Sequence, residues 1–260
     1  MPTQPRNLAI SVLAEREVSE ETPTSIIIPT LNEAQGIGMT IREIIRSLDD
    51  PEIIVIDGNS VDGTSQIAAS LGAKVVRQQG LGKGRAVTQA LQHKDKNTKY
   101  LVLIDGDYTY PAKYIPKMIN ILEEKQDVGM VTGERFSNPG RMELPTHVKK
   151  LITDPYYFGN QALKLAHQIF NRVKMKDPLT GLRVIRCSHI EDFQPKAKSF
   201  DLEVEINEHM KRKGTKTLEI PIKYRQRLGE KKLCTIDGFR ILMRIVIMAL
   251  EGSSLRLKNF

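Results

Sequence analysis

Two aspartates stand two residues apart in Asp105-Gly106-Asp107, directly after the apolar run Tyr100–Ile104. A short apolar run of this kind is typical of a buried strand. Two carboxylates at the carboxyl end of such a strand can share one divalent cation, because Mg²⁺ and Mn²⁺ prefer oxygen ligands. A cation held there can neutralise a diphosphate, which indicates a nucleotide-sugar site. The alternative is a solvated turn, since Asp-x-Asp is common by chance.

Strand-like and helix-like segments alternate through the first half of the chain, and this rhythm must position the aspartates. The expected strands are Ser25–Ile28, Ile53–Ile56, Lys74–Arg77, Leu101–Ile104 and Val128–Val131, and the expected helices are Ala34–Ser47, Asp62–Leu71, Lys83–Gln92 and Ala112–Lys125. The alternation predicts an α/β fold with a mostly parallel sheet and helices on both faces. Ligands of such sheets gather at the carboxyl ends of the strands. The loops Pro29–Glu33, Asp57–Thr64 and Asp105–Asp107 all lie there.

The second half of the chain is less regular. It predicts helices over Asn160–Val173, Phe200–Lys211 and Ile236–Leu250 and a strand over Thr217–Tyr224. We expect a polar tail over 1–22, one folded domain over 23–235, and an apolar C-terminal helix within 236–260.

Composition limits the classes of partner. The chain has 260 residues, is 40% hydrophobic and carries a formal net charge of +8. A basic protein without a dense Lys/Arg tract favours phosphorylated substrates or an anionic membrane face over nucleic acid. Cys187 and Cys234 lack metal-binding spacing, and no signal peptide or run of 18 apolar residues is found. These features predict a cytoplasmic protein.

Several motifs in one order carry a resemblance to a known family. They are Pro29–Glu33, Asp57–Thr64, Gly82–Gly84, Asp105–Asp107, Gly133–Arg135, Asp177–Arg183, Phe200–Glu203 and Gly229–Leu233. From about Ser25 to Leu233 the chain resembles family 2 glycosyltransferases, particularly polyprenyl-phosphate sugar synthases such as dolichyl-phosphate mannose or glucose synthase. The resemblance implies a GT-A type, Rossmann-like fold.

The resemblance also implies which residues hold the nucleotide. Pro29, Leu31 and Glu33 match the segment that binds base and ribose in the family. Ile56 and Asp57 end the second strand, which lines the same site, and the turn before the third helix brings Lys83 near the nucleotide. The family has a second Asp where this chain has Gly58. The identity of the donor therefore stays open among GDP-mannose, UDP-glucose and UDP-N-acetylglucosamine.

In the family the paired aspartates bind the diphosphate through Mg²⁺ or Mn²⁺. Asp105 and Asp107 match them, with Gly106 between them in the substrate site. Relatives often add a Gln two residues later, where this chain has Thr109.

Cations complete the expected site. Arg135 matches an arginine near the phosphates. Arg225, Arg227, Lys231 and Lys232 surround Gly229. In relatives an Arg and a Lys of this segment close over the donor and acceptor phosphates. The Lys matches Lys232, while Arg227 and Arg225 both remain candidates for the Arg. A solvated basic loop is the alternative.

The chemistry of the acceptor can be argued from protons. A sugar hydroxyl needs a general base, whereas a phosphate monoester, with a second pKa of about 6, is largely dianionic at neutral pH. A cation cluster without an obvious base favours a phosphate acceptor. The resemblance implies inverting transfer of a hexose from GDP-mannose or UDP-glucose to dolichyl or another polyprenyl phosphate. Alternatives are a soluble phosphorylated acceptor, such as a phosphoglycerate, and an inactive partner subunit.

A polyprenyl acceptor requires access to a membrane. The segments Asn160–Val173 and Ile236–Leu250 pair apolar faces with basic residues, as interfacial helices do. The basic residues expected at the headgroups are Lys149, Lys150, Arg172, Lys174 and Lys176. We expect a peripheral protein on the cytoplasmic face. Packing of both helices on the sheet, or a separate membrane-anchoring subunit, are the alternatives.

Overall fold

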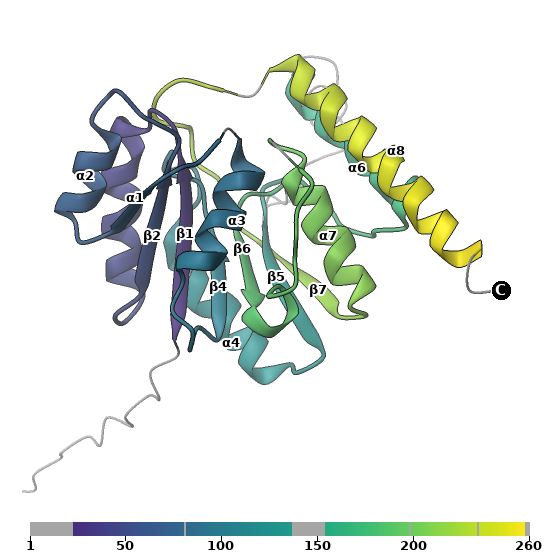
Figure 1. Cartoon of the computed structure of the whole chain (residues 1–260), viewed down its shortest axis with the longest axis horizontal. Helices are drawn as coiled ribbons and strands as arrows, with labels where there is room; N and C mark the ends of the chain where they lie inside the picture. The colour runs from purple at the N-terminus through teal and green to yellow at the C-terminus, as the bar shows by residue number, and fades with distance from the viewer. Residues whose placement is uncertain (1–22, 81, 137–153, 198, 233, 258–260) are drawn as a thin grey trace, which may run out of the picture.

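A seven-stranded sheet forms the centre of the molecule in the computed structural model, which describes residues 23–80, 82–136, 154–197, 199–232 and 234–257 (Figure 1). The strand order is β3-β2-β1-β4-β6-β5-β7. The strands are β1 (Thr24–Thr30), β2 (Glu52–Asp57), β3 (Lys74–Arg77), β4 (Tyr100–Leu103), β5 (Val128–Glu134), β6 (Arg183–Arg186) and β7 (Lys216–Pro221). The predicted mostly parallel α/β sheet is confirmed.

Helices cover both faces of this sheet, as predicted. They are α1 (Ala34–Ser47), α2 (Thr64–Ser70), α3 (Lys83–His93), α4 (Ile115–Glu124), α6 (Pro155–Asn171), α7 (Leu202–Arg212) and α8 (Thr235–Leu257), with 3₁₀ turns at Ala112–Tyr114 and Cys187–His189. One core cluster packs α1, α2 and α4 on the sheet, and a second packs α3 and α7 on the opposite face. Alternate residues of β1 supply both clusters, Ile26 and Ile28 the first and Ile27 the second.

The sequence pattern did not predict β6. This strand of four residues is antiparallel to both β4 and β5. The guanidinium of its first residue, Arg183, is fully buried and donates to the carbonyls of Thr180 (3.0 Å) and Pro178 (2.8 Å) and to Asn207 Oδ1 (2.6 Å). These bonds satisfy the buried charge and fix the loop before β6. The run Arg183–Arg186 is short and begins with a charged residue, so its pattern does not indicate a buried strand, although its two central residues are apolar.

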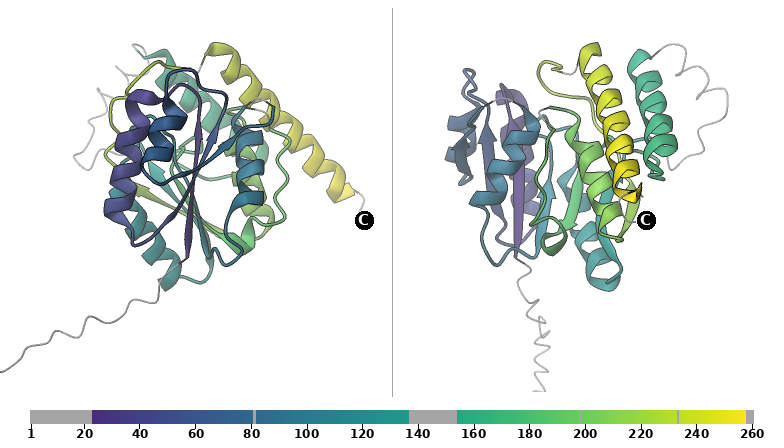
Figure 2. Two further views of the ribbon diagram at one scale, coloured as in Figure 1. Left: turned by 60° about the vertical axis from the view of Figure 1, so that its left-hand side comes forward. Right: turned by 45° about the vertical axis from the view of Figure 1, so that its right-hand side comes forward.

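Helices α6 and α8 lie side by side at one edge of the molecule (Figures 1 and 2). A third small core cluster joins α8 to α7 and includes Val204, Ile241, Ile245 and Met248. Helix α6 begins and ends earlier than the predicted Asn160–Val173, and α8 extends beyond both predicted bounds, Ile236 and Leu250. Within the residues that the structure describes, no helix is long and apolar enough to cross a membrane. The predicted tail over 1–22 and the headgroup candidates Lys149 and Lys150 lie outside the described residues.

Candidate active site

A cavity of about 420 Å³ opens at the carboxyl ends of β1, β2 and β4, where the three predicted acidic loops meet. Parallel neighbours in the sheet bring these ends to one edge. We call it the sheet-edge cavity. The predicted site residues that line it are Pro29, Leu31, Glu33, Gly58, Lys83, Asp105, Gly106, Asp107, Arg227 and Lys232.

A second cavity, of about 510 Å³, lies on the side of α6 and α8, and we call it the helix-side cavity. Its lining includes the predicted residues Arg135, Arg225 and Lys231. Both cavities share five residues, namely Lys83, Asp105, Asp107, Phe200 and Arg227. The aspartate pair and Arg227 therefore stand where the two cavities meet.

Asp105 forms an ion pair with Lys83. Lys83 Nζ lies 2.7 Å from Asp105 Oδ1 and 2.7 Å from Glu203 Oε1. Burial acts to raise the pKa of Asp105, but Lys83 outweighs it and the pKa is lowered. Gly181 is packed so closely that a Cβ there would lie 2.4 Å from Asp105 Oδ2. The backbone N–H of Gly181 donates to Tyr110 Oη at 2.7 Å. Asp105 is thus an ionised carboxylate in a fixed position.

Asp107 is buried and its two oxygens have different partners. Oδ1 accepts from the backbone N–H of Thr109 (3.1 Å) and its hydroxyl (2.6 Å), while Oδ2 accepts from Arg227 Nη1 (2.8 Å). Burial first, and then the neighbouring Asp105, raise the pKa of Asp107. Tyr108 lies between Asp107 and Thr109 and has a φ of 66°, a backbone conformation that costs free energy in a residue with a side chain. Such strain is concentrated at functional sites.

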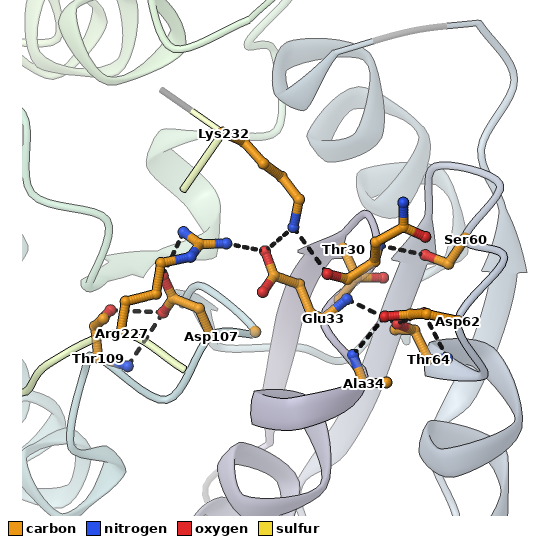
Figure 3. Close-up of polar contacts among 12 residues, drawn as sticks. Thr30, Glu33, Ala34, Ser60, Asp62, Thr64, Asp107, Thr109, Arg227 and Lys232 are labelled. Carbon is orange, nitrogen blue, oxygen red and sulfur yellow. Dashed lines mark hydrogen bonds and ion pairs between the residues drawn. The ribbon is translucent and has the colours of Figure 1, made fainter. Parts of the chain in front are cut away.

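Arg227 joins two acidic loops that are far apart in the sequence (Figure 3). Its guanidinium bridges Asp107 and Glu33, and Lys232 Nζ contacts Glu33 and donates to the Asn32 carbonyl at 3.0 Å. Burial raises the pKa of Glu33, although both cations oppose this shift. Glu33 Oε2 is buried and has no hydrogen-bond partner within the described parts of the chain. The segment that contains both cations is therefore drawn over the sheet edge by electrostatic attraction.

The loop after β2 holds the loop after β1 in place. Asp62 Oδ2 accepts from the Ala34 N–H at 3.0 Å, and Thr64 Oγ1 accepts from the Glu33 N–H at 2.8 Å. Burial acts to raise the pKa of Asp62, but bonds from Thr64 and Ala34 outweigh it and lower it. Figure 3 shows these contacts beside Glu33. The backbone at the start of α1, and with it Glu33, is thereby fixed.

Arg135 makes a buried, bidentate ion pair with Asp177, with distances of 2.7 and 2.8 Å. Its guanidinium lies 5.0 Å from the ring of Phe136 and 5.6 Å from that of Tyr224. Burial opposes its charge, but Tyr110 and Asp177 raise its pKa further above the ordinary value. Arg135 is a permanent cation in the wall of the helix-side cavity.

Asp177→Ala is expected to lower the free energy of unfolding by about 3–5 kcal/mol, because it leaves the buried Arg135 charge uncompensated. Urea denaturation measures this loss. Asp192→Ala is the matched control, since Asp192 pairs with Lys213 on the surface and is 62% exposed; its denaturation midpoint is expected to stay near that of the wild type. Equal midpoints for the two variants would contradict a structural role for Asp177.

The structure separates the two arginine candidates. Arg225 makes a bidentate ion pair with Glu43, at 2.7 and 2.9 Å, and stacks 4.1 Å from the ring centroid of Tyr108. The ion pair of Arg225 is with Glu43, whereas Arg227 pairs with Asp107 of the aspartate pair. Of these two candidates, Arg227 is the one that the structure brings to the carboxylates.

Two predicted substrate-binding residues, Ile56 and Asp57, are not among the residues that line the two cavities. Ile56 is fully buried in the core against α3 and α7. Asp57 is buried and accepts the N–H and hydroxyl of Ser60, at 3.0 and 2.5 Å. These bonds hold the loop after β2 in its conformation.

Sequence reasoning assigned no role to Glu203, Asp177 or Gln78, although each contacts a site residue or lines a cavity. Glu203 and Asp177 stand in motifs that carried the resemblance, but neither had been assigned a role. Gln78 lines the sheet-edge cavity, and no local motif points to it.

The aspartate pair fits a divalent cation of the kind that the sequence resemblance implies. The described residues contain no group of three or more His, Cys, Asp or Glu side chains that could hold a metal. Two carboxylates suffice for Mg²⁺, which keeps several waters and takes substrate phosphates as further ligands. Glu203 Oε2, like Glu33 Oε2, is buried without a hydrogen-bond partner in the described chain. Asp105 and Asp107 would hold the cation, with Thr109 fixing Asp107.

Comparisons with known proteins show the family of the chain. The family model described as "Glycosyl transferase family 2" matches residues 25–191. The chain is 33% identical over 210 residues to "Glycosyltransferase AglJ" of Haloferax volcanii, covering 78% of this chain and 64% of that protein. It is 29% identical over 234 residues to "Dolichyl-phosphate hexose transferase" of the same organism, covering 90% and 96%.

Two further comparisons concern an archaeal relative and a solved fold. The chain is 29% identical to "Dolichol-phosphate mannosyltransferase" of Pyrococcus furiosus over 91% of this chain and 66% of that one. Glucosyl-3-phosphoglycerate synthase of Mycobacterium tuberculosis, solved with Mn²⁺, UDP and glucosyl-3-phosphoglycerate, superposes with a TM-score of 0.61 at 22% identity, covering 89% and 79%. That likeness shows the fold. With a family model matched over more than half of its length, this chain belongs to glycosyl transferase family 2.

Proposed function

We propose that this protein transfers a hexose from a nucleotide-diphosphate sugar to dolichyl or another polyprenyl phosphate at a membrane surface, with Mg²⁺ or Mn²⁺ and with inversion at the anomeric carbon. One observation carries the proposal. The sheet-edge cavity and the helix-side cavity meet at the aspartate pair and Arg227. Donor and acceptor can therefore approach one reacting carbon from two sides.

The donor side has the chemistry of a nucleotide site. Pro29, Leu31 and Gly58 are among the uncharged residues that line the sheet-edge cavity, and Lys83 and Arg227 supply cations beside the carboxylates. The bound metal would act as a Lewis acid that stabilises the departing nucleoside diphosphate. Lys83 and Arg227 can bind phosphate oxygens because both already bind carboxylate oxygens in the same place.

The acceptor side has the chemistry of a phosphate site. Arg135, Arg225 and Lys231 line the helix-side cavity, and Arg227 stands at its junction with the donor side. A phosphate dianion needs no general base, so the required assistance is electrostatic. These cations reduce its repulsion from the donor diphosphate. In-line attack on the anomeric carbon then breaks the bond to the diphosphate and inverts the configuration.

A lipid acceptor is supported by the outer faces of α6 and α8. Along α6, the exposed residues Phe158, Leu165 and Ile169 recur at helical spacing, and along α8 Phe239, Met243, Ile247 and Leu250 do so. The basic residues Arg172 and Lys174 are also exposed next to α6. Such stripes flanked by cations suit the headgroup region of an anionic bilayer. The similarity to two archaeal dolichyl-phosphate enzymes supports the same acceptor.

Ile169→Glu combined with Phe239→Glu is expected to reduce cosedimentation with anionic liposomes about tenfold or more, because both changes put carboxylates on the apolar stripes. Val61→Glu is the matched control, since Val61 is 89% exposed in the loop after β2. That variant is expected to bind as the wild type does. Equal binding by the double variant would contradict docking through α6 and α8.

Nucleotide binding provides a test of the donor half of the proposal. In a thermal-shift screen with Mn²⁺, one class of nucleoside diphosphate is expected to raise the melting temperature, because a ligand that binds the folded state stabilises it. A shift that vanishes with a chelator would support the metal. The absence of any shift with all nucleoside diphosphates and sugar nucleotides would contradict the proposal. A soluble phosphorylated acceptor would instead be indicated by transfer that needs no lipid.

A further inference from the structure

Gly58, which lacks a side chain, leaves a narrow slot in the wall of the sheet-edge cavity. A Cβ built on Gly58 would lie 3.1 Å from the carbonyl oxygen of Thr30, 3.4 Å from Gln78 Oε1 and 3.5 Å from Leu31 Cβ. An aspartate at this position would place its own side chain in the slot. With glycine there, no side chain stands between the cavity and the amide of Gln78.

The orientation of that amide is fixed by its partner. Gln78 Nε2 donates to the carbonyl oxygen of Gly82 at 2.8 Å. A carbonyl oxygen only accepts, so the NH₂ group must face Gly82 and the Oε1 atom must face the slot. Gln78 is only 8% exposed, and its backbone N–H donates to the Asp57 carbonyl at 2.8 Å. Main chain and side chain therefore both hold the acceptor atom in place.

The slot lies at the distance from the aspartate pair that a nucleotide requires. Gln78 follows β3, Gly58 follows β2, and Asp105 follows the end of β4, with β1 between β2 and β4. Adjacent strands are about 4.8 Å apart, so the carboxyl ends of β3 and β4 are separated by about 14 Å. An extended nucleoside diphosphate can span this distance. With its phosphates at Asp105 and Asp107, its base reaches Gly58.

We propose that Gln78 selects the nucleobase of the donor, with Oε1 accepting a hydrogen bond from a ring N–H on the Watson–Crick edge. Uracil and guanine have this donor, whereas cytosine and adenine present an unprotonated ring nitrogen there. With cytosine or adenine, Oε1 would face a second acceptor, and both atoms would be buried without a hydrogen bond. This penalty discriminates between bases more strongly than the loss of one contact does. The inference rests on the proposed function, because it requires a nucleotide donor in the sheet-edge cavity.

Calorimetric titration of the full chain with UDP, CDP, GDP and ADP in the presence of Mn²⁺ tests the inference. Within one matched pair, UDP against CDP or GDP against ADP, the first member is expected to bind about tenfold more tightly or better. Gln78→Met removes the amide and is expected to bring that ratio within about twofold. Gln79→Met is the matched control, since the neighbouring Gln79 is exposed; it is expected to keep the wild-type ratio.

The affinity ratio within a nucleotide pair distinguishes recognition of the base by Gln78 from a role of Gln78 in holding the loop. If Gln78 only held the loop through Gly82, its loss would weaken both members of a pair equally and the ratio would persist, which would overturn the inference and leave the proposed function standing. Equal wild-type affinity for both members of each pair would overturn it as well. If the wild type bound none of the four nucleotides, the proposed function itself would fail, and the inference with it.

Discussion

Asp107→Asn is expected to lower the rate of hexose transfer by about a thousandfold or more, which corresponds to about 4 kcal/mol of transition-state stabilisation. The amide keeps an oxygen for the Thr109 N–H and hydroxyl but is a poor ligand for a divalent cation. Single-turnover transfer assays with saturating donor, at several Mn²⁺ concentrations, measure the loss.

The fold is expected to tolerate this change. Burial raises the pKa of Asp107, so its ionised form costs stability at neutral pH, and an amide removes that cost. Arg227 retains Glu33 as a partner. The unfolding free energy is therefore expected to stay within about 1 kcal/mol of the wild type. Asp127→Asn, at a surface ion pair with Lys216, serves as the control for activity. Full activity of Asp107→Asn would refute the metal site.

Arg227→Ala is expected to reduce transfer by about a hundredfold to a thousandfold, whereas Arg225→Ala is expected to reduce it less than tenfold. The reason is geometric. Arg227 contacts Asp107 where the two cavities meet, while Arg225 is engaged by Glu43. Arg227→Lys is expected to recover only part of the rate, because a lysine cannot replace the bidentate fork.

Stability measurements on the same variants sharpen the distinction. Arg225→Ala is expected to lower the melting temperature more than Arg227→Ala does, since it breaks a bidentate, partly buried ion pair with Glu43. Equal losses of activity for both variants would contradict the assignment of Arg227. So would a loss in Arg227→Ala that is matched by unfolding.

The first half of the fold was predictable because its pattern is local. The segments Ala34–Ser47 and Lys74–Arg77 have the bounds that hydrophobic periodicity predicted. The second half was less predictable. Strand β6 is antiparallel to β5, and β7 pairs with β5 although a long stretch of chain separates them. The predicted strand Thr217–Tyr224 ends at Pro221, since Tyr224 leaves the sheet and packs on Tyr110 with ring centroids 5.0 Å apart.

Within the site, the order of the motifs indicated candidate residues but not the side chains that each of them contacts. The pairing of Arg227 with Glu33 joins positions that only the sheet and the C-terminal segment bring together. The Arg135–Asp177 pair and the Lys83–Glu203 pair likewise connect distant segments. Ile56 is expected at the nucleotide because of its place at a strand end, and the structure places its side chain in the core against α3 and α7. No motif marks Gln78, and the role that we propose for it depends on its position beside Gly58.

Transfer to a lipid acceptor is the most direct measurement of the central claim. Purified protein, labelled GDP-mannose or UDP-glucose, Mn²⁺ and liposomes that contain dolichyl phosphate are expected to give a labelled, organic-extractable dolichyl-phosphate hexose. Its formation is expected to stop with a chelator and with Asp107→Asn. Label that appears only on a water-soluble phosphorylated acceptor, with none on the lipid for either donor, would contradict the account.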